Sequence, residues 1–330
     1  MTKKNSTSDL PFLLAPIGKD YLWGGSKLKQ DFHKGFISCS PLAETWECST
    51  HPAGLSKLRT SDGSEKSFLD FLTENAEVLC NPGHRVLFPV LLKLIDAKEN
   101  LSLQVHPSDE EAAVYEEGQK GKTEFWYILD AEPGAFIYLG FKSSCHQETI
   151  RKLVANGELE SVLNKVYVQK GDSFLIQPGT VHAIGKGIVL AEIQENSNLT
   201  YRLYDYGRRD ADGNLRELHI EKALRVIDFS CTDKVKRRIK TIKYEPGIRK
   251  ERLVQCDYFI ADVWRIEEGV LLPRTTNQNC IVLCVEGSGF LEKTNRQKIF
   301  SFRKGDCFFM PKSDEQFHLV GKFEIVIVGI

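Results

Sequence analysis

The spacing of hydrophobic positions along the chain follows the period of a β-strand over most of its length. Residues 101–106, LSLQVH, alternate strictly, so that the apolar side chains share one face while Gln104 and His106 share the other. Similar strand-like patterns recur at 124–130 and dominate from about residue 236 to the end, where Gly-containing turn signals separate them. The pattern predicts a mainly β protein.

Four segments interrupt the β pattern and are predicted as a helical insertion. In the first and the last of them, apolar residues recur at helical spacing. The second begins at Ser108 and has Glu111 three residues later, which is the signature of a capping box. The four predicted helices lie near 66–80, 108–119, 147–157 and 217–228.

One short motif occurs twice. Residues 171–176 and 305–310 share the pattern Gly-Asp-x-Phe-apolar-apolar, and a proline follows each of them. A β-rich chain that repeats such a turn and strand is typical of two copies of one jelly-roll unit. His182 lies eleven residues beyond the first glycine, whereas Gln316 holds the equivalent place in the second copy, with His318 close by.

These patterns predict two domains. Residues 1–235 are expected to form a metal-binding jelly-roll domain that carries the helical insertion. Residues 236–330 are expected to form a second jelly-roll-like β domain without a metal, because Gln316 replaces the histidine of the first copy.

Charge and composition exclude several classes of function. The 330 residues carry a formal net charge of −1, which argues against a general polyanion-binding protein or a membrane-surface protein. The basic stretch 234–252 has little aromatic interleaving, so a solvated face between domains is favoured over a nucleic-acid site. The most apolar window, 86–95, is too short and too interrupted to span a membrane.

The cysteines and the first residues bear on the cellular compartment. Nine cysteines are scattered without a Cys-x-x-Cys pair, which favours free thiols over disulfides or a thiolate zinc site. The first residues, MTKKNSTSDLPF, lack the apolar core of a signal peptide. We therefore expect a cytoplasmic protein.

Four polar residues form the candidate metal site. Gln104 and His106 point the same way from one predicted strand, Glu124 lies on the next, and His182 lies in the segment GTVHAI. Two imidazoles, a carboxylate and an amide oxygen suit a borderline metal such as zinc. Lys122 shares a face with Glu124 and places a cation beside it. The spacing alone is equally compatible with histidines that serve only the core or the surface.

A second polar segment, 192–208, carries Arg202. A guanidinium group suits fixed recognition of a phosphate or stabilisation of a developing oxyanion. The alternative interpretation is a salt bridge between Arg202 and Asp205 at the rim of the domain.

Several motifs together resemble one known family. LLKLIDAKENLSLQVHP, GKTEFWYIL, GTVHAI and EIQENSNLTYRLYDYGR, in this order, resemble the signature set of the short bacterial type I mannose-6-phosphate isomerases. WGG at 23–25 and AETWE at 43–47 resemble N-terminal segments of the same family. The resemblance covers about 11–230 and implies a pair of cupin-like jelly-roll β-barrels with a helical insertion. At 194–198, where relatives often read QQNSD, this chain reads QENSN, so that Glu195 and Asn198 are the two differences.

The resemblance also implies an activity and residue roles. The activity would be the interconversion of mannose 6-phosphate and fructose 6-phosphate through an enediol, so the partner would be a small sugar phosphate. Arg202 would be catalytic, and Lys122 would assist polarisation or proton transfer. Lys93 and Ser102 would contact the substrate, with Lys93 as the candidate for holding its phosphate. The implied ligands of one Zn²⁺ per chain are Gln104, His106, Glu124 and His182.

Two other functions fit part of the pattern. Two histidines and one carboxylate also form the facial triad of a non-haem iron oxygenase, which is a known use of the cupin fold. A non-catalytic sugar-binding cupin is the second alternative. The candidate ligand Gln104 and the cations Lys122 and Arg202 favour a phosphorylated sugar as the substrate. The sequence leaves the proton-abstracting base open between Lys122, a metal-bound hydroxide and Glu195, and it does not define the oligomeric state.

Overall fold

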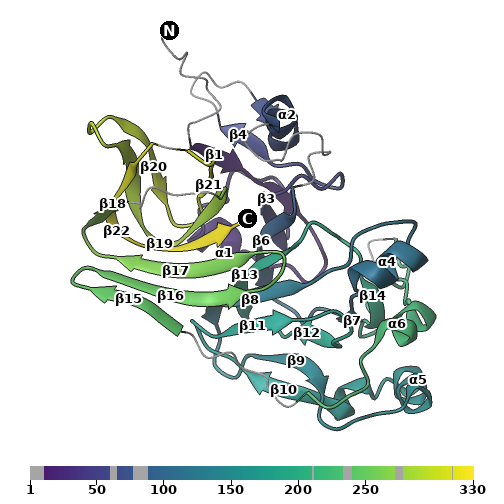
Figure 1. The fold of residues 1–330 in the computed structure, drawn as a ribbon. Helices are drawn as coiled ribbons and strands as arrows, with labels where there is room; N and C mark the ends of the chain where they lie inside the picture. The colour runs from purple at the N-terminus through teal and green to yellow at the C-terminus, as the bar shows by residue number, and fades with distance from the viewer. Residues whose placement is uncertain are drawn as a thin grey trace.

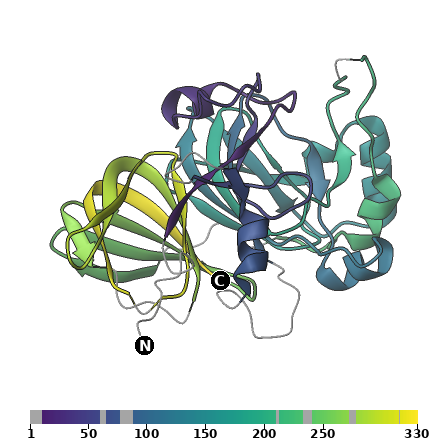
Figure 2. The same ribbon diagram turned by 90° about the horizontal axis from the view of Figure 1, so that it is seen from above.

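Strands arranged in three sheets make up most of the protein (Figure 1). The computed structural model describes residues 11–59, 65–76, 88–209, 212–232, 240–271, 278–313 and 315–330. Figure 2 shows two lobes, one built mainly from the blue and teal middle of the chain and the other from its yellow-green C-terminal part.

The first lobe, which we call the N-terminal sandwich, contains two of the three sheets. Side chains of both sheets meet in one buried cluster, where Trp126 and Leu190 pack with Ile137 and Ile184. The six-stranded sheet has the order β11-β8-β13-β6-β3-β2. Its strands are β2 (Ile17–Lys19), β3 (Glu44–Cys48), β6 (Val90–Ala97), β8 (Glu124–Ala131), β11 (Ser173–Ile176) and β13 (Ile188–Glu195). The five-stranded sheet, in the order β10-β9-β12-β7-β14, contains β7 (Leu103–Val105), β9 (Phe136–Phe141), β10 (Leu163–Tyr167), β12 (His182–Ile184) and β14 (Tyr201–Tyr204).

The third sheet has eleven strands, and we call it the C-terminal sheet. Its main path is β15-β16-β17-β22-β19-β21-β1-β4-β5, with β18 paired to β22 and β20 paired to β19. Its C-terminal strands are β15 (Lys240–Glu245), β16 (Ile248–Gln255), β17 (Ile260–Ile266), β18 (Gly269–Leu271), β19 (Cys280–Lys293), β20 (Lys298–Arg303), β21 (Cys307–Met310) and β22 (Phe317–Gly329). Three strands from the start of the chain extend it, namely β1 (Phe12–Ala15), β4 (Lys57–Arg59) and β5 (Glu65–Ser67).

The repeated Gly-Asp motif forms the same turn in both halves. Gly171 and Gly305 have φ angles of 91° and 89°, in the left-handed region that favours glycine. In each turn the aspartate carboxylate accepts a hydrogen bond of 3.0 Å from the backbone N–H three residues earlier. The order β11-β8-β13-β6-β3-β2 is matched by β21-β19-β22-β17-β16-β15 in the C-terminal sheet. The two copies predicted from the motif therefore share one strand topology.

The prediction of a mainly β fold with a helical insertion is confirmed, with one difference. Each strand order runs from one edge strand to another, so the sheets are open and do not close into barrels. The expected division between residues 235 and 236 lies within 233–239, outside the described residues.

The helices are short and lie mainly on the N-terminal sandwich. Helices α4, α5 and α6 gather at its end remote from the C-terminal sheet (Figures 1 and 2). Buried side chains of α5 and α6 pack against the five-stranded sheet. The capping box predicted at Ser108 and Glu111 is present at the start of α4. The helices are α1 (Lys27–Asp31), α2 (Phe68–Glu74), α4 (Asp109–Tyr115), α5 (Gln147–Asn156) and α6 (Ile220–Val226), with a 3₁₀ turn at Leu159–Val162. Residues 77–80 of the first predicted helix lie outside the described residues.

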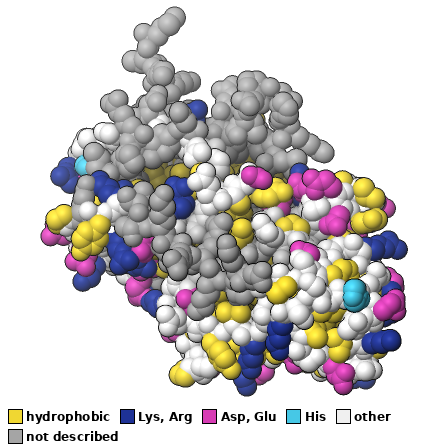
Figure 3. Space-filling model, turned by 60° about the horizontal axis from the view of Figure 1, so that its bottom comes forward, with side chains coloured by type: hydrophobic (Ala, Val, Ile, Leu, Met, Phe, Trp, Pro, Cys, Tyr) yellow, Lys and Arg dark blue, Asp and Glu magenta, His cyan; other side chains and the backbone are white. Residues whose placement is uncertain are grey.

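The surface carries mixed charge. On the face drawn in Figure 3, Lys and Arg side chains are interspersed with Asp and Glu, in keeping with the near-zero net charge. Eight cysteines in the described segments are free thiols, as the sequence predicted, and Cys80 lies outside those segments. Across the part of the chain that the structure describes, no helix has both the length and the apolar character of a membrane span.

Candidate metal centre

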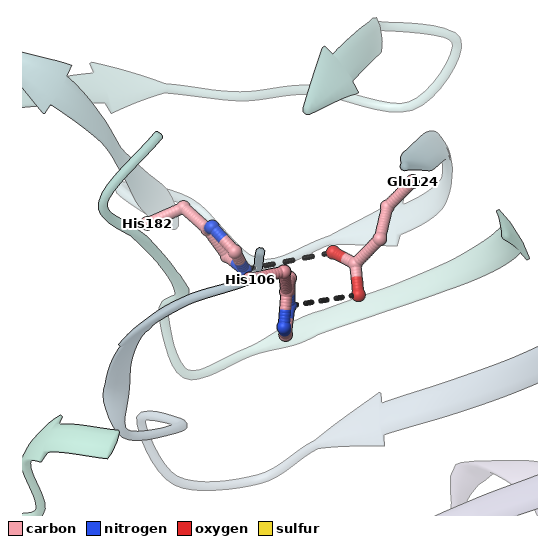
Figure 4. Close-up of side chains that lie close together, drawn as sticks. All are labelled: His106, Glu124 and His182. Atoms are coloured by element: carbon pink, nitrogen blue, oxygen red, sulfur yellow. Dashed lines mark ion pairs between the residues drawn. The ribbon is translucent and has the colours of Figure 1, made fainter. Parts of the chain in front are cut away.

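The two sheets of the N-terminal sandwich bring three predicted ligands together. His182 opens β12, which pairs with Gln104 of β7, and His106 follows the end of β7. Glu124 opens β8 in the six-stranded sheet. One ligand atom from each of His106, Glu124 and His182 lies within 4.8 Å of the others, and all three residues are buried (Figure 4).

Backbone carbonyls orient both imidazoles. His106 Nδ1 lies 2.8 Å from the carbonyl oxygen of Leu199, and His182 Nδ1 lies 2.9 Å from that of Thr180. A carbonyl oxygen can only accept, so each Nδ1 donates, and in a neutral ring each Nε2 presents a lone pair. These lone pairs face Glu124, at 3.1 Å from His106 Nε2 to Oε1 and 3.5 Å from His182 Nε2 to Oε2.

The electrostatics of the centre suit a metal cation. Burial lowers the pKa of His106 to about 3, and burial also lowers the pKa of His182, so both rings are neutral near pH 7. Burial alone would raise the pKa of Glu124, but Lys122, with its Nζ 2.5 Å from Oε1, helps to hold it well below its usual range. His106 Nε2 and Glu124 Oε2 are buried without a hydrogen-bond partner among the described residues. Facing acceptor atoms of this kind fit a cation between them.

Gln104 borders the centre but presents its amide nitrogen to it. Its Nε2 lies 3.3 Å from His182 Nε2, and its Oε1 accepts a hydrogen bond of 3.4 Å from Ser102 Oγ. A half-turn of the amide about its terminal bond would present the oxygen to the same point, since the two ends of an amide have nearly the same shape.

A pocket of about 230 Å³ adjoins the centre and collects the other predicted residues. Five residues singled out from the sequence line it, namely Lys93, Ser102, Gln104, Lys122 and Arg202. Sequence reasoning did not assign a role to seven further polar or aromatic lining residues, which are Tyr21, Trp23, Glu44, Glu192, Asn198, Thr200 and Arg216. The sequence did contain a signal that could have identified Glu192. Apolar and polar residues alternate around position 192, which places the Glu192 side chain on the polar face of its strand.

Two buried carboxylates flank Lys93 in this pocket. Lys93 Nζ lies 2.9 Å from Glu192 Oε2 and 3.7 Å from Glu44 Oε2. Tryptophan N–H groups hold both acids, because Trp126 donates to Glu192 and Trp46 donates to Glu44. Burial would lower the pKa of Lys93, but Glu192 and Glu44 outweigh it and raise that pKa. Lys93 is therefore a buried cation whose charge is already balanced.

Arg202 lies beside the metal centre because β14 pairs with β7, with Arg202 opposite Gln104. Its Nη1 donates to the carbonyl oxygen of Glu217 at 2.8 Å. Its Nε is buried and has no hydrogen-bond partner among the described residues. The ion pairs found for Asp205 in this part of the structure are with Arg208 and Arg216 rather than with Arg202.

Comparisons with known proteins identify two matching family models. Residues 12–134 match the phosphomannose isomerase type I catalytic domain, and residues 249–330 match the mannose-6-phosphate isomerase cupin domain. The chain is 36% identical over 321 residues to mannose-6-phosphate isomerase ManA of Bacillus subtilis, covering 96% of this chain and 98% of that protein.

Solved structures match along nearly the whole chain. A crystal structure of the mannose 6-phosphate isomerase from Bacillus subtilis matches with a TM-score of 0.88 and 32% identity, covering 97% of this chain and 99% of that one. A zinc-bound mannose 6-phosphate isomerase structure matches with a TM-score of 0.74 at 17% identity and the same coverage, which shows a shared fold.

Proposed function

The chain belongs to the type I mannose-6-phosphate isomerase family, and on this premise we propose that it interconverts mannose 6-phosphate and fructose 6-phosphate. The observation that carries the proposal is the buried centre of His106, Glu124 and His182, which adjoins a pocket lined by lysines and arginines. Such a pocket suits a small anionic substrate that must reach a metal.

We propose one Zn²⁺ per chain as the cofactor, held by His106, Glu124, His182 and the turned amide of Gln104. Nitrogen and oxygen ligands without sulfur suit zinc when it acts in catalysis. A zinc-bound structure among the matching isomerases supports this choice. When bound, zinc would supply a Lewis acid that polarises substrate oxygens.

The other site residues have proposed roles in moving one proton between C1 and C2. The reaction would pass through an enediol whose developing negative charge needs a fixed cation, and Arg202 would supply it. Lys122 lines the pocket and would assist polarisation or proton transfer, whereas Glu195 is not among the pocket-lining residues. Lys93 and Ser102 would contact the substrate.

We also propose that residues 1–235 form the catalytic domain and that residues 236–330 hold no metal. Pairing with the repeated motif places Glu124 opposite Ile176 and Cys280 opposite Met310, so that Cys280 replaces the carboxylate in the second copy. The interior of the second copy is apolar, with Phe308 and Phe317 in its buried cluster.

A coupled assay with mannose 6-phosphate tests the function, alongside glucose 6-phosphate and unphosphorylated mannose. We expect isomerisation of mannose 6-phosphate, a sharp loss when the phosphate is absent, abolition by a chelator and recovery with added zinc. Oxygen consumption with iron dependence would instead support the oxygenase. A folded, metal-replete protein without isomerase activity would leave the sugar-binding cupin as the better interpretation.

A further inference from the structure

The cations of the pocket divide into two groups that differ in how far carboxylates balance them. The two lysines are each 3% exposed and each lie against buried acids. Lys93 contacts Glu192 and Glu44, and Lys122 contacts Glu124. A lysine that is already paired has little net charge to offer to a phosphate dianion, although it can donate to a sugar hydroxyl.

Carboxylates balance the two arginines of the pocket, Arg202 and Arg216, less fully than they balance the lysines. Among the described residues, Arg208 and Arg216 share the buried carboxylate of Asp205, with Arg216 Nη1 at 3.2 Å, while Arg202 uses a backbone carbonyl and its buried Nε has no partner. Burial lowers the pKa of Arg202, and the nearby guanidinium of Arg216 lowers it further. Positive charges held close together with too few acids are the electrostatic pattern of an anion site.

The fold keeps these two arginines adjacent. The segment that carries Arg216 returns to β14, where His219 N donates to the carbonyl oxygen of Arg202 at 2.7 Å. Arg202 N in turn donates to His219 Nδ1 at 3.2 Å. These bonds bring the chain that carries Arg216 back to the strand of Arg202. Both arginines line the pocket, together with Tyr21.

We propose that Arg216 binds the phosphate group of the substrate at the exposed end of the pocket, while Arg202 keeps its role beside the metal centre. The inference rests on the proposed function and assigns a residue that the sequence did not single out. A guanidinium fork can donate two parallel hydrogen bonds to phosphate oxygens, and the side chain of Arg216 is 23% exposed, within reach of a ligand entering from solvent.

The alternative is that Arg216 only neutralises Asp205. The two roles differ in what they predict for a substrate without phosphate. If Arg216 only neutralises Asp205, its replacement should reduce activity on mannose 6-phosphate and on unphosphorylated mannose equally. Arg209 provides a matched control: it is exposed, lies in the same stretch of chain, donates to the carbonyl oxygen of Gly213 and is not among the pocket-lining residues. Replacing it changes the net charge by the same amount.

The test compares Arg216→Gln, Arg216→Lys and Arg209→Gln with the wild type, all zinc-loaded and checked for folding. We expect Arg216→Gln to raise KM for mannose 6-phosphate about ten-fold or more and to weaken calorimetric binding of inorganic phosphate to a similar degree. Zinc content and activity on unphosphorylated mannose should stay within two-fold of the wild type. Arg216→Lys should have a KM between those of the wild type and Arg216→Gln, because lysine keeps the charge but lacks the two-pronged guanidinium group.

Three results would overturn the proposal: equal losses on both substrates, equal effects of Arg216→Gln and Arg209→Gln, or unchanged phosphate binding in Arg216→Gln. Phosphate that binds only to the zinc would give the last of these. A wild-type protein without isomerase activity would refute the proposed function, and the phosphate titration would still decide whether Arg216 forms an anion site.

Discussion

At the metal centre, the backbone rather than neighbouring side chains fixes the two imidazoles. The carbonyl oxygens of Leu199 and Thr180 accept from the Nδ1 atoms of His106 and His182, so ring orientation and tautomer do not depend on a bound ion. The surrounding core is large and apolar. Removing one imidazole should therefore remove a ligand without unfolding the protein.

We predict that His106→Ala and His182→Ala each lose zinc under conditions in which the wild type keeps one ion per chain. The physical reason is that the three remaining ligands of the proposed set hold zinc more weakly than all four do. Elemental analysis of dialysed samples, with circular dichroism for folding, measures this. His146→Ala, at an exposed position, is the control. Full zinc retention in both variants would remove the proposed site.

A second residue-scale prediction concerns the pH dependence of stability at Glu195. Its carboxylate accepts a hydrogen bond of 2.8 Å from Thr123 N, and burial raises its pKa from 4.5 to about 7. Below about pH 4.5 the carboxyl group is protonated in both the folded and the unfolded protein. Between about pH 4.5 and 7 it ionises in the unfolded chain but stays protonated in the folded protein, so stability falls as pH rises.

We therefore expect Glu195→Gln, which stays neutral, to gain melting temperature relative to the wild type as pH rises from about 4.5 to about 7, with no further gain above that. Scanning calorimetry of both proteins in the same buffers measures the difference. A difference that is constant across this range would show that Glu195 keeps an ordinary pKa.

At the scale of elements, the local patterns were predictable and the pairings were not. The alternation of 101–106 placed Gln104 and His106 on one face, and β7 and the turn after it bring both to the centre. Glu192 and Lys93 meet because β13 pairs with β6 in a register that sets them opposite each other. Such a register depends on strands about a hundred residues apart, which a single sequence does not reveal.

The capping box of α4 gives a prediction at this scale. Helix α4 lies in the connection between β7 and β8, where Lys122 N donates to the carbonyl oxygen of Pro107. Ser108→Ala removes the side-chain acceptor for Glu111 N and should lower the free energy of unfolding by about 1 kcal/mol. Urea denaturation measures it, with exposed Ser144→Ala as the control. Equal stabilities of the two variants would show that the cap contributes nothing.

The whole molecule combines a repeat that the sequence shows with a contribution of N-terminal strands to the C-terminal sheet that it does not show. The Gly-Asp turn marks both copies because its geometry is local and needs glycine at Gly171 and Gly305. In contrast, β1 pairs with β21, so the start of the chain completes the C-terminal sheet. No local pattern encodes that contact, since it joins segments almost three hundred residues apart.

A buried ion pair reinforces this junction. Lys34 Nζ lies 2.8 Å from Glu47 Oε2 and donates to the carbonyl oxygen of Gly305 in the second turn at 2.5 Å. Thr45 Oγ1 donates to the other carboxylate oxygen at 2.6 Å. Both charged side chains are almost fully buried, at 2% and 0% exposed. Removing one partner leaves a desolvated charge in the core, whereas removing both does not.

We predict that Lys34→Met and Glu47→Leu each lower the free energy of unfolding by about 3–5 kcal/mol, and that the double variant loses clearly less than their sum. Guanidinium denaturation of the four proteins in this cycle gives the coupling energy. The exposed pair of Lys170 and Glu286, which also joins the two lobes, serves as the control cycle. Its coupling should be about 1 kcal/mol or less, because solvent screens it. Additive losses at Lys34 and Glu47 would mean that the two charges stabilise the junction independently, through Gly305 and Thr45, rather than through each other.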